Sequence, residues 1–276
     1  MPGGPERASD GRSAETSARR RPGTLAGMSA PPHSPSAPGR LRRVGTVLAM
    51  LAAAQLLAGL AVHALAAPTP MPLAVLAVAA SLVSWPVAAW TLRPRGTDGV
   101  TAADLLTCLR HLGAGALATS AALVLAGALE ERSWPLAILL AATIGTDALD
   151  GPVARRAGTA GPIGGRIDME ADAVLFLVLS VLTAPVVGPW VLLIGLMRYL
   201  YVAAMQVRPA LRRPLAFSQS RRLIGGGQGV ALGIAMLPAV PVPLAQAVVG
   251  LALALLLFSF GRDVVHLERA HRADVG

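Results

Sequence analysis

Long apolar runs alternate with short polar or basic segments along most of the chain, from about residue 44 to residue 262. A helix of about 20 residues is needed to cross the hydrocarbon core of a bilayer, and the apolar runs approach or reach that length. We therefore interpret them as membrane-spanning helices. The eight predicted spans cover residues 44–66, 71–92, 103–128, 134–150, 166–184, 187–207, 223–240 and 243–262. This pattern predicts an all-α, polytopic membrane protein with about eight transmembrane helices.

The charged residues agree with this interpretation. Only 14% of the residues are charged, whereas 54% are hydrophobic, and the basic residues are all arginines in short clusters between apolar runs. A nucleic-acid partner is not expected, because its binding face would spread basic residues among aromatic ones. If the N-terminal tail lies in the cytoplasm, Arg132 is the only basic residue in the outer connections. This asymmetry predicts a multi-pass protein of the cell membrane with both ends inside, and Trp90 is interpreted as an interfacial anchor near an inner end.

Residues 1–43 are rich in Pro, Gly, Ser and Arg and hold few bulky apolar side chains. Such a segment cannot bury enough surface to offset its loss of conformational entropy, so we expect a disordered, basic cytoplasmic tail. The segment is too long for the basic region of an ordinary signal peptide. We expect the first span to remain as an anchor, unless the true start is Met28.

Four aspartates stand at the predicted cytoplasmic ends of two neighbouring spans. Asp147 and Asp150 are three residues apart and Asp168 and Asp172 are four apart, so each pair shares one face of its helix. Unpaired like charges at the edge of a membrane are costly. One explanation is that basic residues of the connecting segment pair with them, namely Arg155, Arg156 and Arg166. The other is a hard divalent cation such as Mg²⁺, which prefers oxygen ligands.

The same stretch reproduces a complete family signature. The pattern DxxDGxxARx₈GxxxDxxxD is matched by Asp147, Asp150, Gly151, Ala154, Arg155, Gly164, Asp168 and Asp172. The chain therefore resembles the CDP-alcohol phosphatidyltransferases, whose core consists of six membrane helices. The resemblance implies a catalytic six-helix core at 101–262, two extra helices at 44–100 and a cytoplasmic C-terminal tail at 263–276.

Enzymes of that family transfer a substituted phosphate from a CDP-linked donor, usually CDP-diacylglycerol, to an alcohol and release CMP. The implied metal site consists of Asp147, Asp150, Asp168 and Asp172. Its first three members would hold two divalent ions, Mg²⁺ or Mn²⁺, and Asp172 would be the general base toward the acceptor hydroxyl. The implied donor site is lined by Gly151, Ala154, Arg155 and Gly164.

Upstream, the stretch DLLTCLR at 104–110 is similar to the NxLTxxR sequence that opens the family's first core helix and helps to bind the nucleotide. Thr107 and Arg110 match this sequence and are predicted to contact the nucleotide. Asp104 stands where the family usually has Asn. We expect it to be either a displaced nucleotide contact or a helix N-cap.

The acceptor alcohol is less well defined. Arg198 lies well inside the sixth predicted span and resembles an arginine in the fourth core helix of several family members, so we expect a functional role for it. The next inner loop carries Arg208, Arg212, Arg213, Arg221 and Arg222. The first three are interpreted as ordinary loop charge, whereas Arg221 and Arg222 either share that role or bind a phosphorylated acceptor such as glycerol 3-phosphate or inositol phosphate. The GKxKT-like stretch of phosphatidylglycerophosphate synthases is absent, which argues against assigning the chain to those synthases.

These features predict a membrane enzyme of phospholipid biosynthesis that acts on CDP-diacylglycerol among membrane lipids. The alternative is a non-catalytic membrane or transport protein with an intramembrane pathway of acids and arginines. Such a pathway would scatter its acids over several helices, whereas the motif confines them to two. Because the family is often dimeric through its core helices, a homodimer is one expectation for this chain.

Overall fold

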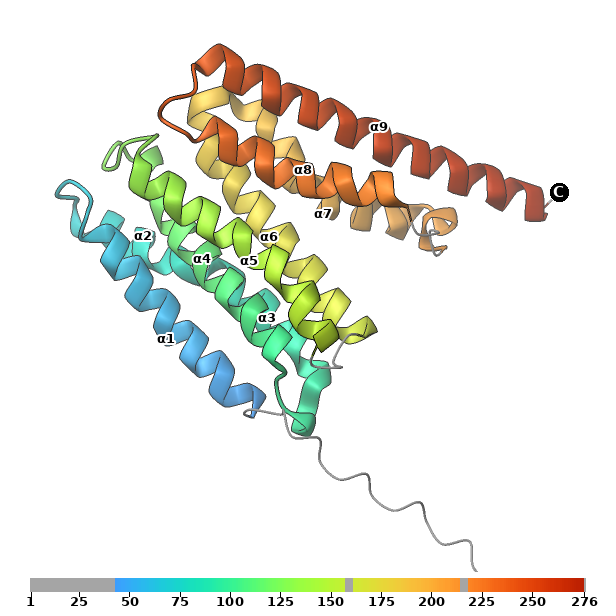
Figure 1. Cartoon of the computed structure of the whole chain (residues 1–276), viewed down its shortest axis with the longest axis horizontal. Coiled ribbons are helices and arrows are strands. Elements are labelled where there is room, and N and C mark those ends of the chain that lie inside the picture. Colours follow the sequence, from blue (N-terminus) through green and yellow to red (C-terminus); the bar gives the residue numbers. More distant parts are fainter. Residues whose placement is uncertain (1–42, 157–160, 214–217, 276) are drawn as a thin grey trace, which may run out of the picture. The chain divides into compact units, whose positions relative to one another are not determined.

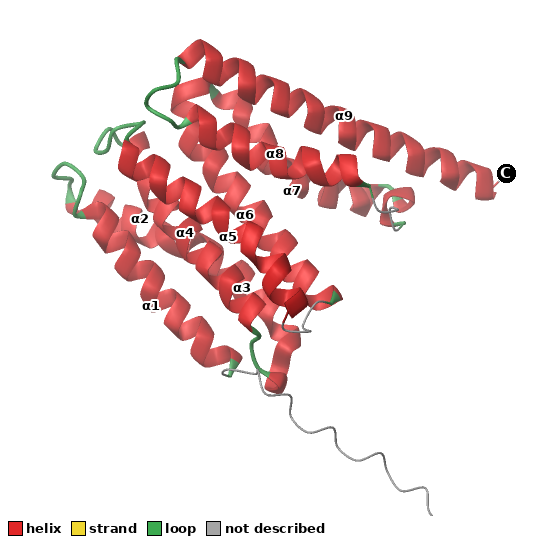
Figure 2. Cartoon of the chain, viewed as in Figure 1, coloured by secondary structure: helices red, strands yellow, loops and turns green. Residues whose placement is uncertain are grey.

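The computed structural model of the chain describes residues 43–156, 161–213 and 218–275. Every regular element within these residues is a helix, as the apolar pattern predicts (Figure 1, Figure 2). The elements are α1 (Val44–His63), α2 (Met71–Ala80), η1 (Ser81–Ser84), α3 (Trp85–Leu92), η2 (Arg93–Asp98), α4 (Ala102–Leu125), α5 (Trp134–Arg156), α6 (Pro162–Val187), η3 (Pro189–Val191), α7 (Leu192–Val207), η4 (Pro209–Arg212), α8 (Gln219–Ala235) and α9 (Val242–Val275). The chain divides into two units, Met1–Ala37 and Pro38–Gly276, and all the described residues lie in the second. The all-α prediction is confirmed, and the predicted tail, apart from Arg43, lies outside the described residues.

Six helical segments within the described residues are long and apolar enough to cross a membrane. They are Val44–His63, Met71–Gly96, Ala102–Leu125, Pro162–Val187, Pro189–Val207 and Val242–Ala273. Helices α5 and α8 occupy the positions of the other two predicted spans. Within α5, Trp134–Thr146 is an apolar segment shorter than these six. The chain is thus polytopic, and the number of eight spans stays a prediction.

The second predicted span, residues 71–92, is not one continuous α-helix. Helix α2 gives way to the 3-10 turn η1, and α3 then begins with Pro86 in its first turn. Proline has no N–H to donate, which interrupts the α-helical hydrogen-bond pattern at this place. The turn packs tightly against α4, because a Cβ atom added to Gly115 would lie 2.3 Å from the carbonyl oxygen of Ser81. A residue larger than glycine cannot be accommodated there without a shift of the backbone.

A buried polar network joins the same helices. Gln55 of α1 donates from Nε2 to Oγ of Ser84 at 2.8 Å and to the carbonyl oxygen of His111 at 2.9 Å. Oγ of Ser84 donates to that same carbonyl at 3.0 Å. Polar side chains between membrane helices hold them together in this way, because the surrounding lipid offers no hydrogen-bond partners. Helix α1 and turn η1 are therefore fixed to α4 by hydrogen bonds as well as by close packing.

Helix α4 lies at the centre of the helix packing, where it contacts α1, α5 and α6. The main hydrophobic core includes Leu117 of α4, Leu140 of α5, Leu179 and Leu182 of α6, and Leu232 of α8, all almost completely buried. Helices α8 and α9 pack as a hairpin whose two members both contact α6 (Figure 1). This arrangement places α6 between α4 on one side and the α8–α9 hairpin on the other.

The two helices that carry the aspartate motif are longer than the predicted spans 134–150 and 166–184. Helix α5 continues to Arg156, and α6 begins at Pro162, a residue that is favoured at the first position of a helix. Gly164 therefore lies inside α6, although the sequence interpretation placed it in a linker. Asp168 lies in the second turn of α6 and not at the start of the helix.

Candidate functional site

Arg110 connects the two acidic residues of α6 to α4. Its side chain is completely buried, and its Nη1 atom donates to Oδ1 of Asp168 at 2.5 Å and to Oδ1 of Asp172 at 2.7 Å. The two aspartates are about one helical turn apart, so a single guanidinium can reach both. Their side chains remain 39% and 30% exposed. The sequence interpretation considered only Arg155, Arg156 and Arg166 as partners of the acids, whereas Asp168 and Asp172 both pair with an arginine of α4.

A capping box fixes the start of α4. Oγ1 of Thr101, the N-cap residue, accepts the N–H of Asp104 at 3.2 Å, and Oδ2 of Asp104 accepts the N–H of Thr101 at 2.9 Å. The other carboxylate oxygen of Asp104 pairs with Nη2 of Arg95 at 2.7 Å. The structure thus gives Asp104 a capping role, although the N-cap residue itself is Thr101. Thr107, one turn further on, is buried and donates to the carbonyl of Ala103 at 3.2 Å.

Five predicted site residues lie on the second half of α5, namely Asp147, Asp150, Gly151, Ala154 and Arg155. The helix is described through Arg156, but the side chains at these positions are outside the described part of the chain. Ile144 precedes Asp147 by three residues and lines a cavity that also reaches α6.

The cavity has a volume of about 860 Å³ and lies between α6, α7, α8 and α9. Part of its wall is apolar and is formed by Leu175, Phe176, Ile194, Leu256 and Phe260. Its polar and charged lining residues include Asp168, Asp172, Arg198, Arg221, Arg222, Gln228, Ser259 and Asp263. The predicted base Asp172 and the predicted acceptor-site residues Arg198 and Arg221 therefore surround one space.

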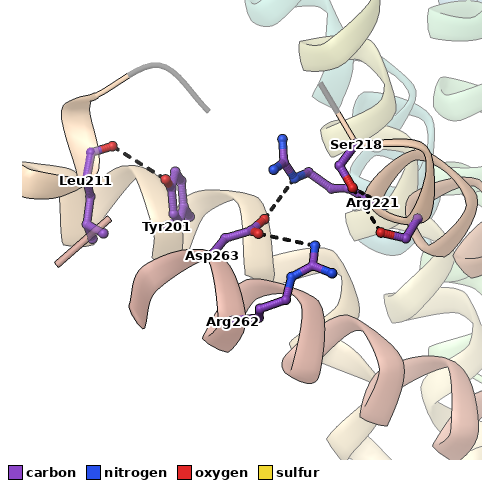
Figure 3. A network of polar contacts seen from close by, with 7 residues as sticks. Tyr201, Leu211, Ser218, Arg221, Arg262 and Asp263 are labelled. Atoms are coloured by element: carbon purple, nitrogen blue, oxygen red, sulfur yellow. Dashed lines mark hydrogen bonds and ion pairs between the residues drawn. The ribbon is translucent and has the colours of Figure 1, made fainter. Parts of the chain in front are cut away.

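Both of these acceptor-site arginines are paired with carboxylates. Arg198 of α7 pairs with Glu170 of α6. Nε of Arg221, on α8, donates to Oδ2 of Asp263 on α9 at 2.8 Å (Figure 3). Nη2 of Arg262 lies 3.3 Å from the other oxygen of the same carboxylate. The two cations are thus held in place at the cavity wall by acids from neighbouring helices.

The surroundings of Arg221 are ordered by two further contacts. Ser218 is the N-cap of α8, and its hydroxyl oxygen accepts the N–H of Arg221 at 3.4 Å (Figure 3). Tyr201 of α7 makes an edge-to-face contact with Phe260 of α9, with 5.5 Å between the ring centroids. Its hydroxyl group donates to the carbonyl of Leu211 at 3.4 Å. These contacts tie the start of α8, the end of α7 and α9 together around the charged wall of the cavity.

The sequence interpretation missed four polar residues of the site: Glu170, Gln228, Ser259 and Asp263. Glu170 and Asp263 could have been found as charged residues inside or beside predicted spans, where such residues are usually functional. Gln228 donates to the carbonyls of Ile224 and Ala252, both at 3.0 Å. Oε1 of Gln228 and Oγ of Ser259 are buried and have no hydrogen-bond partner among the described residues. Single uncharged polar residues in an apolar run give no comparable signal.

Arg208 and Arg212 have surface contacts that fit their interpretation as loop charge. Arg208 is well exposed, with its Nη1 atom 3.9 Å from Oε1 of Glu268. Arg212 donates from Nε to the carbonyl of Met205 at 2.9 Å, which satisfies a carbonyl near the end of α7.

The acids of the site provide donors suited to a hard cation. Within the described side chains, no three His, Cys, Asp or Glu residues gather closely enough to hold a metal ion. Asp168 and Asp172 supply two carboxylates of the kind that Mg²⁺ and Mn²⁺ prefer. Both carboxylates are partly exposed, so they are accessible from the cavity that they line. Asp147 and Asp150, the other members of the predicted set, are outside the described side chains.

Comparison with known proteins gives one match. A model of the CDP-alcohol phosphatidyltransferase family matches residues 100–258, which is more than half of the chain. The matched region begins just before α4 and ends within α9. A search of curated proteins and a search of solved structures each found no significant match.

Proposed function

The chain belongs to the CDP-alcohol phosphatidyltransferase family, and on this premise we propose that it transfers a phosphatidyl group from CDP-diacylglycerol to a small alcohol. Members of this family are transferases of substituted phosphate groups, so the chain is an enzyme and not a non-catalytic transport protein. In the proposed reaction the acceptor oxygen bonds to the phosphorus that carries the diacylglycerol. The bond from this phosphorus to the bridging oxygen breaks, CMP leaves, and the acceptor proton passes to a base.

The observation that carries the proposal is the shared cavity. Asp172, which belongs to the acid motif, and Arg198 and Arg221, which belong to other helices, line the same space. A carboxylate that can accept a proton and cations that can bind a phosphate thus line one cavity, as a site for a phosphorylated acceptor requires. The apolar part of the wall is suited to lipid, as expected for a site that receives a diacylglycerol-bearing donor.

On the donor side, we assign Asp147, Asp150 and Asp168 as ligands of two divalent ions, Mg²⁺ or Mn²⁺. Such ions, when bound, neutralise charge on the pyrophosphate and on the departing CMP. The oxygen donors of Asp168 and Asp172 fit this assignment. Gly151, Ala154, Arg155 and Gly164, with Thr107, are assigned to the cytidine diphosphate by their places in the motif.

Asp172 is the proposed general base, and Arg110 is proposed to orient it. Arg110 approaches Asp168 and Asp172 from α4 and is not part of the cavity lining, so the acceptor can approach Asp172 from the opposite side. The buried guanidinium holds both carboxylates in fixed positions before the substrates arrive. Such preorganisation lowers the cost of reaching the reactive geometry.

On the acceptor side, we propose a phosphorylated polyol, such as glycerol 3-phosphate or inositol phosphate. Arg198 and Arg221 are assigned to its phosphate, which guanidinium groups can bind through two hydrogen bonds. Oε1 of Gln228 and Oγ of Ser259 are buried polar atoms at the cavity that suit the hydroxyl groups of a polyol. The arginine asymmetry of the connections supports a reaction at the cytoplasmic face, within phospholipid biosynthesis. The homodimer stays a prediction.

The test is incubation of the purified protein with CDP-diacylglycerol, Mg²⁺ or Mn²⁺ and a panel of phosphorylated and plain alcohols. CMP release and the lipid product are followed together. We expect CMP to appear in equal amounts with a new phospholipid, and only with some acceptors. No CMP release with any acceptor would contradict the proposed reaction, and turnover only with uncharged alcohols would contradict the phosphorylated acceptor.

A further inference from the structure

Helices outside the matched family region contact the candidate donor site. Family similarity begins at residue 100, whereas α3, which precedes it, packs against α6 and α4, and η2 reaches α4 through Arg95. A hydrophobic cluster joins Leu51 of α1, Leu92 of α3, Cys108 of α4 and Ile167 of α6. Ile167 directly precedes Asp168, and Cys108 lies between Thr107 and Arg110. The appended helices thus support the backbone on both sides of the contact between Arg110 and the aspartates.

Two charged contacts accompany this packing. Arg166, next to Ile167, lies over the ring of Trp90 on α3, with 4.4 Å from its guanidinium carbon to the ring centroid. Trp90 was interpreted from the sequence only as an interfacial anchor, and this stacking gives it a specific partner. On the other side, Arg95 of η2 pairs with Asp104 of α4 at 2.7 Å.

Arg95 also reaches the first turn of α6. Its Nη2 atom would lie 3.7 Å from a Cβ atom added to Gly164, a residue of the family motif. The same Nη2 atom pairs with Asp104, so one guanidinium group is bound to the start of α4 and lies near the start of α6. These two starts lead to Thr107 and Arg110 on α4 and to Asp168 and Asp172 on α6.

The buried carboxylate of Asp104 requires a compensating cation, which Arg95 supplies. The side chain of Asp104 is only 1% exposed, and a buried carboxylate is costly unless a cation compensates it. The asparagine that is usual at this position in the family would be neutral and would have no such need. Arg95 is 14% exposed and comes from a segment that the family model does not match. Asp104 and Arg95 therefore form a charge pair that links the appended helices to the family core.

We infer that Arg95 is a positioning residue for the donor site, acting through Asp104 and the starts of α4 and α6. The inference rests on the proposed function, because it assumes that this site binds a CDP-linked donor. Without the cation, Asp104 is an uncompensated negative charge beside the binding site of an anionic pyrophosphate. The start of α4 loses its contact with η2, and the donor is repelled.

The test is a double-mutant cycle of Arg95→Gln and Asp104→Asn, with Arg93→Gln as the matched control. Arg93 is an exposed arginine of the same short helix, so its replacement removes the same charge. For Arg95→Gln we expect the KM for CDP-diacylglycerol to rise about tenfold or more, with kcat changed less than about threefold. The neutral residue in Asp104→Asn should restore the KM of the double variant to within about threefold of the wild type, because no buried charge is then left unpaired. Arg93→Gln should behave like the wild type.

Three outcomes overturn the inference. If the double variant stays as poor as Arg95→Gln, Arg95 acts on the donor directly and not through Asp104. If Asp104→Asn alone is as poor as Arg95→Gln, Asp104 is itself a nucleotide contact. If Arg95→Gln has normal kinetics, the contact has no positioning role.

A measurement without turnover separates this inference from the proposed function. The thermal midpoint of each purified variant is measured in detergent, with and without CDP-diacylglycerol. Arg95→Gln should have a lower midpoint than the wild type and a smaller rise of the midpoint when CDP-diacylglycerol is added. In the double variant both values should return toward those of the wild type. A wild-type protein that releases no CMP overturns the proposed function, whereas failure of this recovery overturns the inference about Arg95.

Discussion

Arg221 and Asp263 form an ion pair across the α8–α9 hairpin, with Nε of Arg221 2.8 Å from Oδ2 of Asp263. The two residues come from opposite ends of the hairpin in sequence, and both line the cavity beside Asp172. A cation held in this way is positioned before any ligand binds. A guanidinium group that is already fixed at the cavity wall is suited to bind the phosphate of an acceptor.

Replacement of Arg221 should therefore affect the acceptor more than the donor. For Arg221→Gln we expect the acceptor KM to rise at least about tenfold, since a hydrogen bond to a charged group contributes about 1.5–3 kcal/mol. The donor KM should change less than about threefold. Arg208→Gln, on an exposed loop, is the control with the same loss of charge. Steady-state kinetics in both substrates provide the measurement, and an equal rise of both KM values would contradict an acceptor role.

Replacement of Asp172 and replacement of Asp150 should affect donor binding and turnover differently. Asp150→Asn should weaken both donor binding and turnover, because a neutral amide is a poorer ligand for a hard cation. Asp172→Asn should lower the rate by roughly 10²-fold or more, as expected for the loss of a general base, while donor affinity changes by less than about tenfold. Donor binding and CMP release are measured for each variant after its monodispersity has been checked. Near-normal turnover of Asp172→Asn, or loss of donor binding as complete as in Asp150→Asn, would show that Asp172 is not the base.

Activity should depend on a divalent cation. We expect an excess of chelator to abolish CMP release and added Mg²⁺ or Mn²⁺ to restore it, because the pyrophosphate and the acids of the site repel each other without a cation. NaCl at the same ionic strength serves as the control. Full turnover in excess chelator would exclude the two-metal assignment.

The connection that contains residue 160 and the one that contains residue 241 should lie on opposite sides of the membrane. Cysteines introduced at Ala160 and Pro241 are labelled with a reagent that does not cross the membrane, in a Cys108→Ala background that removes the native thiol. We expect the label to reach position 241 from outside and position 160 only after the membrane is opened. Labelling of both positions from the same side would contradict the eight-span topology.

Gly115 should tolerate no larger side chain. In Gly115→Ala the new methyl group would lie 2.3 Å from a backbone oxygen of η1, and a shift of this kind typically costs about 1–3 kcal/mol. The matched control is Gly145→Ala, a substitution within α5 where a Cβ atom would meet nothing within 4 Å. Thermal unfolding in detergent should show a clear decrease of the midpoint for Gly115→Ala alone. Equal midpoints would mean that α4 and η1 separate without cost.

The features that depend on local composition and spacing, namely the helices and the acidic motif, could be predicted from the sequence. Apolar runs indicated the helices, and the spacing from Asp147 to Asp172 identified the family that the comparison confirms. The break between α2 and α3 was missed because the run from 71 to 92 is predominantly apolar. Hydropathy does not reveal the effect of Pro86 or of a close backbone approach. The end of α5 was placed too early and the start of α6 too late, because the limits were drawn where the apolar runs end and begin, whereas both helices continue into polar sequence.

Pairings between distant residues had no signal in the sequence. Arg110 precedes Asp168 by 58 residues, and nothing in either segment indicates that the two side chains meet. The same holds for Arg198 with Glu170 and for Arg221 with Asp263. Residue type and motif spacing suggested which residues belong to the site, but only the packing of α4, α6, α8 and α9 determines which charges compensate each other.

The contacts of Gln55 and Ser84 with the carbonyl of His111 bear on how this protein can be divided. The region shared with the family starts at residue 100, yet a fragment cut there would leave that carbonyl and the bare backbone around Gly115 facing lipid. The boundary of common ancestry is therefore not a boundary of independent folding. A fragment for expression, or a chimera with the core of a related enzyme, would have to keep the chain from Arg43 onward. A graft of α4 alone would need a glycine at position 115, where α4 lies against η1.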